Sequence, residues 1–138
     1  MKRKSIYDCT IISLNFINSE KGKLIPIQNE IDIPFETQRV YYLYDIPAGE
    51  SRGGHAHKEL NQLIIATSGS FEIMITDGRI KRNFVLNRPD IGLYLPPGFW
   101  REITNISSGA ICLVLASKEY SEQDYIRSYE EFTKFYQE

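Results

Sequence analysis

His55 and His57 are the only histidines in the chain, and a single alanine separates them in the segment RGGHAHK. On a β-strand, residues at positions i and i+2 face the same side, with Cα atoms about 6.5–7 Å apart. Neutral imidazoles bind transition metals, and they also exchange protons near neutral pH. The pair therefore predicts either part of a metal site or a centre for acid–base catalysis.

The residues around this pair resemble the two sequence motifs of the cupin superfamily, with two of the four metal-ligand positions altered. Gln62 stands where the first motif has a glutamate, and Arg101 stands where the second motif has a histidine. The positions that match are Gly49, His55, His57, Gly69, Pro96, Gly98 and Asn105.

The two altered positions favour proton transfer over metal binding. An amide such as Gln62 is a weak ligand, and Arg101 stays protonated, so it would repel a divalent cation beside the imidazoles. Arginine instead recognises phosphate or stabilises a developing oxyanion. We therefore expect a metal-free site for an anionic substrate with a carbonyl group. The basic candidates near it are Arg39, Arg52, Lys58 and Arg101.

Short strand patterns separated by turn residues must position these groups. Apolar, β-branched and aromatic residues predict strands at residues 10–16, 23–28, 39–46, 63–67, 71–76, 80–86, 91–95 and 110–116. Asp77-Gly78 predicts a hairpin turn, and Pro26 weakens the second strand. The pattern is typical of an all-β fold, an antiparallel sandwich or barrel of the jelly-roll type. With the resemblance to the cupin motifs, we expect a cupin jelly-roll barrel of short antiparallel strands with one C-terminal helix.

Only the C-terminal segment has helical spacing. Ser121 is the expected N-cap, with Asp124 as the acidic partner of a capping box. Six large side chains then recur at helical intervals, and we expect them to pack against the barrel or a second subunit: Tyr125, Ile126, Tyr129, Phe132, Phe135 and Tyr136.

Length, charge and cysteine content restrict the class of protein. The 138 residues suit one domain spanning 1–138, and the net charge of −2 argues against nucleic acid or a membrane surface as the main partner. Polar residues interrupt the N-terminal apolar stretch, which therefore reads as a strand rather than a signal peptide. Cys9 and Cys112 lie within strand patterns as expected buried thiols, and we predict a cytoplasmic location.

Four longer segments resemble one cupin family, the dTDP-4-keto-6-deoxy-D-glucose 3,4-ketoisomerases, also called WxcM-like proteins. They are FETQRVYYLYDIP (35–47), RGGHAHKELNQLII (52–65), IGLYLPPGFWREI (91–103) and LVLASKEYSEQDYIRSYEEF (113–132). The resemblance covers almost the whole chain. The His-Ala-His-Lys core and the tail at residues 120–129 are more specific than the general cupin pattern.

The resemblance implies an enzyme that moves a ketone from C4 to C3 of a dTDP-linked 6-deoxyhexose through an enediol, without a cofactor. His55 and His57 would share the acid–base work. Arg39 and Arg52 would hold the diphosphate, with Lys58, Gln62 and Arg101 as further substrate contacts. Tyr41 or Tyr94 would line the sugar or base pocket. Trp100 is expected either to stack on a ring or to be structural.

The resemblance further implies a homodimer whose N-terminal strands are interleaved. Arg101 resembles the branch of the family whose product keeps an equatorial C4 hydroxyl, whereas the loop at residues 19–22 has Lys21 where relatives often have arginine. Two other functions stay open from the residues: a nucleotide-sugar epimerase and a non-catalytic sugar-binding cupin.

Overall fold

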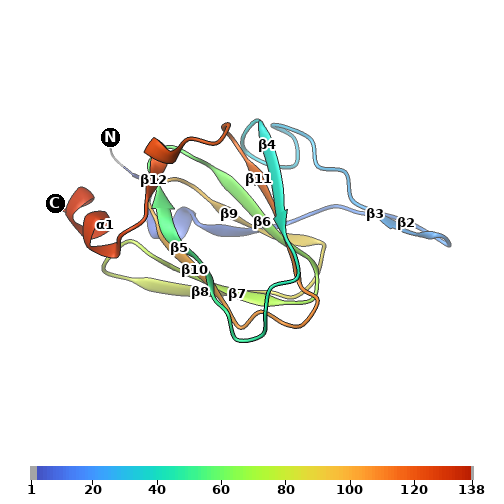
Figure 1. Cartoon of the computed structure of the whole chain (residues 1–138). Helices are drawn as coiled ribbons and strands as arrows, with labels where there is room; N and C mark the ends of the chain where they lie inside the picture. Colours follow the sequence, from blue (N-terminus) through green and yellow to red (C-terminus); the bar gives the residue numbers. More distant parts are fainter. Residues whose placement is uncertain (1–2, 138) are drawn as a thin grey trace.

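In a computed structural model, which describes residues 3–137, short antiparallel strands form two facing five-stranded sheets and a separate hairpin (Figure 1). The first sheet contains, in spatial order, β1 (Thr10–Ser13), β9 (Ile91–Leu95), β6 (Gln62–Ser68), β11 (Ile111–Ala116) and β4 (Arg39–Leu43). The second contains β12 (Tyr125–Ile126), β5 (Arg52–His57), β10 (Trp100–Thr104), β7 (Phe71–Thr76) and β8 (Lys81–Leu86). The hairpin pairs β2 (Ile17–Ser19) with β3 (Gly22–Leu24).

The predicted all-β fold of antiparallel strands with one C-terminal helix is confirmed. Within the described residues, hydrogen bonds join the main strands into two separate sheets, and no single closed ladder encircles the interior. A short 3₁₀ turn, η1 (Ile6–Asp8), precedes β1, and another, η2 (Glu122–Asp124), precedes β12.

The main core lies between the two sheets, and smaller clusters cover the outer face of each. On β6, Ile64 faces the interior, whereas its neighbours Leu63 and Ile65 pack against an outer cluster that includes Leu14 and Phe35. Both faces of this strand are therefore buried, which explains its unbroken apolar run. The alternation decides which side chains of a strand can reach the interior.

Local signals predict most strand positions but not all strand ends. The β7 and β9 boundaries agree with the predicted ranges, and the Asp77-Gly78 turn joins β7 to β8 with Gly78 at a φ of 99°. The second predicted strand is wrong beyond Leu24, where β3 ends two residues before Pro26. β4 ends at Leu43, and Asp45 then adopts a φ of 53° that strand geometry excludes.

The predicted start of the C-terminal helix is wrong. The side chain of Ser121 makes no capping hydrogen bond, and Tyr125 lies on β12, which pairs with β5. The helix α1 (Tyr129–Phe135) begins after Ser128, whose hydroxyl accepts from the Glu131 amide. Helical spacing was misleading because pairing with β5 satisfies the backbone and buries Ile126 between sheet and helix.

The two cysteines are free and buried, as predicted, and burial raises the pKa of each thiol to about 12. Within residues 3–137, the only α-helix is far too short to cross a bilayer.

Candidate active site

Strand β5 brings His55 and His57 to the interior side of the second sheet. Their ring centroids are 4.9 Å apart, and the rings are perpendicular. His57 is only 1% exposed, whereas His55 is half-buried. The predicted arrangement of both imidazoles on one face is therefore confirmed.

Four of the predicted substrate-binding residues surround this pair. Arg101 lies opposite His55 in the register of β10 and β5, and its side chain is buried. Gln62, on the facing sheet, donates from Nε2 to the Tyr41 hydroxyl at 3.0 Å. The Arg39 guanidinium lies 5.3 Å from the centroid of the Tyr41 ring. Each of the two sheets therefore contributes one guanidinium to the site, Arg39 from the first and Arg101 from the second.

Several buried polar atoms in this group have no hydrogen-bond partner. Among the residues that the structure describes, the unpaired buried side-chain atoms are Arg39 Nε, His55 Nε2, His57 Nε2, Gln62 Oε1 and Arg101 Nε. Buried polar groups in folded proteins are nearly always hydrogen-bonded. All five atoms belong to predicted site residues, so together they mark a place for a polar ligand.

The electrostatic environment keeps both imidazoles neutral and the guanidinium charged. Burial, with further contributions from Arg101 and the neighbouring imidazole, lowers the pKa of His55 to about 2. Burial also lowers the pKa of His57 to about 4, although its hydrogen bond with Asp124 acts in the opposite direction. Burial lowers the pKa of Arg101 to about 10, so this side chain is still protonated at neutral pH. Neutral bases beside a fixed cation suit proton abstraction with oxyanion stabilisation.

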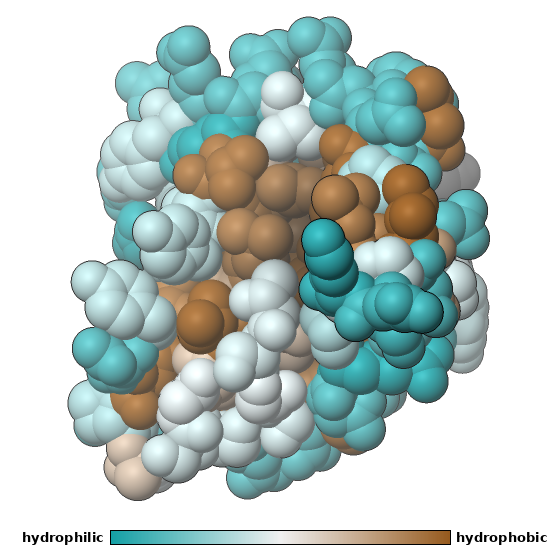
Figure 2. Space-filling view, turned by 90° about the vertical axis from the view of Figure 1, so that its right-hand side faces the viewer, coloured by the Kyte–Doolittle hydropathy of each residue, from teal (hydrophilic) through white to brown (hydrophobic). Residues whose placement is uncertain are grey.

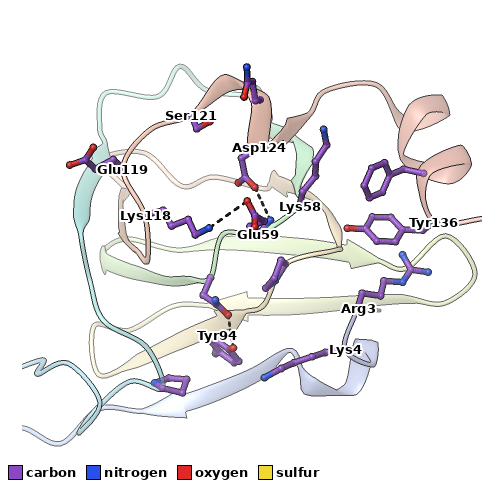
Figure 3. A pocket seen from close by; sticks show the side chains of 15 residues that line it. Arg3, Lys4, Lys58, Glu59, Tyr94, Lys118, Glu119, Ser121, Asp124 and Tyr136 are labelled. Carbon is purple, nitrogen blue, oxygen red and sulfur yellow. Dashed lines mark hydrogen bonds and ion pairs between the residues drawn. The ribbon is translucent and has the colours of Figure 1, made fainter. Parts of the chain in front are cut away.

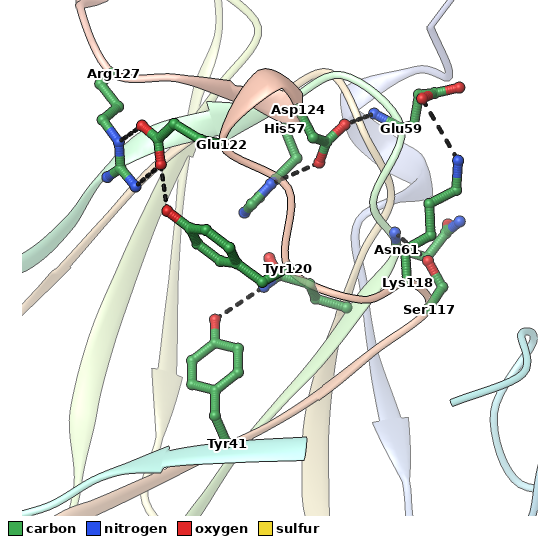
Figure 4. Close-up of polar contacts among 11 residues, drawn as sticks. Tyr41, His57, Glu59, Asn61, Ser117, Lys118, Tyr120, Glu122, Asp124 and Arg127 are labelled. Atoms are coloured by element: carbon green, nitrogen blue, oxygen red, sulfur yellow. Dashed lines mark hydrogen bonds and ion pairs between the residues drawn. The ribbon is translucent and has the colours of Figure 1, made fainter. Parts of the chain in front are cut away.

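Asp124 is a member of the site that the sequence alone did not reveal. Its Oδ2 lies 2.8 Å from His57 Nδ1, and its Oδ1 accepts from the Glu59 amide at 2.7 Å (Figure 4). The adjacent Tyr125 ring lies 4.3 Å from the His57 ring and 5.0 Å from the His55 ring. The specific tail motif at residues 120–129 was the available signal, but its helical spacing concealed the strand.

The same tail places charged and aromatic side chains beside the histidine pair. Arg127 donates to both carboxylate oxygens of Glu122, at 2.6 and 2.9 Å (Figure 4). Its guanidinium also lies over the Tyr125 ring, 4.1 Å from the ring centroid. The Tyr120 hydroxyl donates to the same carboxylate, and the Arg39 guanidinium lies 5.6 Å from the Tyr120 ring. Two arginines therefore flank this tyrosine.

Two predicted substrate-binding residues point away from the histidines. Lys58 and Tyr94 line a cavity of about 1040 Å³ outside the facing sheets, which Asp124 also borders (Figure 3). Lys58 comes directly after His57, the last residue of β5, and its Nζ lies 5.5 Å from the centroid of the Phe135 ring on α1. The Tyr94 hydroxyl donates to Asn61 Oδ1 at 2.8 Å, and its ring stacks on Phe35.

Trp100 also lies apart from the histidine pair, whereas Arg52 lies on the same strand as the histidines. The Trp100 ring packs under α1, 5.4 Å from the Tyr129 ring, which agrees with the structural alternative considered for it. Arg52 is exposed at the first position of β5. The charged side chains that shift the pKa of the two histidines are Arg39, Arg101, Asp124 and Arg127.

The altered cupin positions meet at the same place. Gln62 and Arg101 border the histidine pair, so an amide and a guanidinium occupy the positions where the cupin motifs have two metal ligands. Within residues 3–137, no three side chains of His, Cys, Asp or Glu form a group that would hold a metal ion.

Comparison with known proteins identifies the family. The family model described as FdtA, WxcM-like, C-terminal matches residues 7–137. A TDP-4-oxo-6-deoxy-α-D-glucose 3,4-oxoisomerase from Aneurinibacillus thermoaerophilus is 40% identical over 125 residues, which cover 91% of this chain and 90% of that protein.

Solved structures agree with this match. A 3,4-ketoisomerase from Helicobacter canadensis is 47% identical and covers 93% of this chain and 96% of its own, with a TM-score of 0.91. The WlaRB TDP-quinovose 3,4-ketoisomerase from Campylobacter jejuni is 46% identical and covers 94% of this chain and 99% of its own, with a TM-score of 0.89. The chain therefore belongs to the FdtA family of WxcM-like C-terminal domains.

Proposed function

We propose that this protein is a metal-independent isomerase that moves the ketone of dTDP-4-keto-6-deoxy-D-glucose from C4 to C3. The observation that carries this proposal is the pair of neutral imidazoles whose Nε2 atoms have no partner beside the buried Arg101. The names of the relatives, which are TDP-sugar 3,4-ketoisomerases, support the same reaction and substrate class.

The proposed mechanism uses only proton transfers. One imidazole removes the proton from C3, and the electrons form an enediol across C3 and C4. The other imidazole moves a proton from the oxygen on C3 to the oxygen on C4, and a proton returned to C4 completes the 3-ketone. Arg101 would stabilise the negative charge that develops on oxygen in between. Substrate and product are isomers, so no redox cofactor is consumed.

The diphosphate requires cationic partners near the histidines. Arg39 presents an unpaired Nε at the interior, which suits this role, and Arg52 at the start of β5 is a second proposed contact. We further propose the product with an equatorial C4 hydroxyl. The presence of arginine at position 101 and the 46% identity to a TDP-quinovose ketoisomerase support this choice, because quinovose is 6-deoxyglucose.

We propose that the active form is a homodimer with interleaved N-terminal segments. The β2–β3 hairpin projects from the two sheets (Figure 1), and its apolar residues Ile17 and Leu24 are exposed, as is Phe16 directly before β2. Figure 2 shows apolar surface gathered on the side of the molecule from which this hairpin projects. A second copy would bury it. Light scattering that finds only monomers at working concentration would contradict this arrangement.

A cytoplasmic location fits this proposal. Both thiols of the chain are free and buried, and such reduced thiols suit a reducing compartment.

The reaction is tested by NMR of the product formed from dTDP-4-keto-6-deoxyglucose. We expect a carbonyl at C3, and the C4 configuration is read from the same spectrum. An inverted centre with the carbonyl still at C4 would indicate an epimerase, and binding without conversion would indicate a sugar-binding module. Stoichiometric iron or zinc in the purified protein would contradict the metal-free mechanism.

The histidines are tested by replacing each one. We expect His55→Asn and His57→Asn each to reduce turnover at least about a hundredfold, which is the usual contribution of a general acid or base. Lys81→Asn, at an exposed position of β8, serves as a control with unchanged turnover. Near-normal activity in both histidine variants would refute the mechanism.

A further inference from the structure

Asp124 makes the only ion-pair contact with a histidine among the residues that the structure describes. It is the last residue of η2, directly before β12, and it is separated from His57 by 67 positions in the sequence. β12 holds it there, since Tyr125 pairs with His57 and Ile126 pairs with Ala56 in the β12–β5 register. The β12–β5 pairing therefore holds the Asp124 carboxylate against one imidazole nitrogen, Nδ1 of His57.

The contacts of Asp124 determine where the proton of His57 lies. Burial raises the pKa of Asp124, but hydrogen bonds from His57 and from the Glu59 amide outweigh burial and hold this pKa below its ordinary value. The carboxylate is therefore ionised at neutral pH, and an ionised carboxylate only accepts hydrogen bonds. At a separation of 2.8 Å, His57 Nδ1 must be the donor and must carry the hydrogen.

The second nitrogen of His57 then has a free lone pair. A neutral imidazole carries one hydrogen, so Nε2 is unprotonated when Nδ1 is the donor. His57 Nε2 is buried and has no protein partner. It belongs to the same group of unpaired atoms as those of His55, Gln62 and Arg101, where we place the substrate.

We propose that Asp124 is a positioning residue that fixes His57 with its proton on Nδ1 and its lone pair on Nε2, facing the substrate. This inference rests on the proposed isomerase function for its catalytic consequence, but the tautomer itself is a property of the free protein. Asp124 does not touch the substrate in this scheme. It acts by selecting the tautomer and the ring orientation that a proton acceptor needs.

The surroundings of His57 make this carboxylate necessary. The other charged groups acting on the imidazole are the cations Arg39 and Arg101, and both lower its pKa. Asp124 supplies the opposing interaction through its hydrogen bond and its charge. Without it, His57 would be a weaker base with no group to define which nitrogen is protonated.

Asp124→Asn tests the tautomer with little change in shape. Asparagine has one acceptor oxygen, and the Glu59 amide and His57 Nδ1–H both require one. If the oxygen stays with the Glu59 amide, the asparagine NH₂ faces Nδ1 and forces the hydrogen onto Nε2. That tautomer presents a donor to the substrate, where the reaction needs an acceptor.

Long-range ¹H–¹⁵N NMR correlations report the tautomer directly. The chain contains only two histidines, so His55→Asn leaves a single imidazole to assign. We expect the Nδ1–H form for His57 in the otherwise unchanged protein and the Nε2–H form, or a mixture, when Asp124→Asn is added. An Nε2–H form in the presence of Asp124 would overturn the proposal, whatever the enzyme activity is.

Kinetics test the consequence for catalysis. We expect Asp124→Asn to lower kcat by about a hundredfold or more with KM changed less than about threefold, because Asp124 acts on the proton transfer and not on binding. Asp124→Glu keeps an acceptor-only carboxylate, so it should recover part of kcat. Equal losses in both variants, or an unchanged kcat in Asp124→Asn, would overturn the positioning role.

Asp90→Asn is the matched control, because it makes the same substitution at another ion-paired aspartate. Asp90 lies in the turn before β9, and its carboxylate pairs with Arg88 at 2.9 Å. We expect its kcat and its imidazole spectrum to be unchanged.

If the unmodified enzyme fails to convert the keto-sugar, the proposed function fails, while the NMR result still decides whether Asp124 fixes the tautomer. If Asp124→Asn does not fold, the His55→Asn spectrum alone is decisive.

Discussion

Arg101 is a cation whose burial costs stability, and replacing it should make the protein more stable while abolishing its function. The side chain is only 3% exposed, its Nε has no partner, and the nearest charged acceptor, Asp124, is already bound to His57. Removing one guanidinium from water without a carboxylate partner carries a desolvation penalty of several kcal/mol. Arg101→Met keeps a similar length and removes the charge.

The size of the effect follows from the pKa of Arg101. Burial lowers that pKa from 12.5 to about 10, which corresponds to about 3 kcal/mol of lost stability while the group is protonated. At neutral pH the guanidinium is protonated in both the folded and the unfolded chain, so the folded state carries this whole penalty. Allowing for lost packing, we expect Arg101→Met to stabilise the protein by about 1–3 kcal/mol. For a domain of this length, that raises Tm by about 3–10 °C.

Calorimetry at fixed protein concentration measures this change, and turnover of the keto-sugar is measured in parallel. Arg82→Met is a control that we expect to lower the stability instead of raising it, because Arg82 donates to the carbonyls of Ile6 and Cys9 at 2.9 and 2.8 Å. Losing these bonds should lower the stability by about 1–3 kcal/mol. If Arg101→Met lowers Tm as much as Arg82→Met does, the guanidinium of Arg101 is a structural group, and its assignment to the ligand is refuted.

Two further predictions concern pH and the turn at Gly69. Burial lowers the pKa of both histidines, to about 2 and about 4, so the stability they contribute is complete above their ordinary pKa of 6.5 and is lost as the pH falls below it. Urea unfolding between about pH 7 and 5 should show a loss of up to about 1.4 kcal/mol per pH unit for each histidine, and His55→Asn/His57→Asn should reduce that slope. If the unfolding free energy of this double variant falls with pH as steeply as that of the unsubstituted protein, the attribution of this loss to the two histidines is refuted. Gly69→Ala places a Cβ 2.8 Å from Ala110 Cα at a φ of 68°, and we expect a loss of about 1–3 kcal/mol by urea unfolding. Gly49→Ala, where φ is 84° and no atom lies within 4 Å, is the control for backbone strain alone, and an equal loss in both variants would contradict the proposed clash.

The sequence by itself determined most of the strand pattern and the core of the site, but not β10 or β12. Period-two alternation placed His55 and His57 on one face, and the motif spacing brought Gln62 and Arg101 to the positions of two missing ligands. These inferences succeeded because they depend on the local geometry of a strand and on motifs read along the chain.

Only the tertiary structure decided which other residues join the site. The folded chain places Lys58, Tyr94 and Trp100 away from the histidines, and the pairing of β12 with β5 brings Asp124 to His57 Nδ1. The aromatic spacing of that tail suits a helix as well as a strand beside β5, and the sequence contains no local signal that distinguishes them. Pairing with β5 decided the outcome, because it satisfies the backbone of β12 and the buried imidazole together.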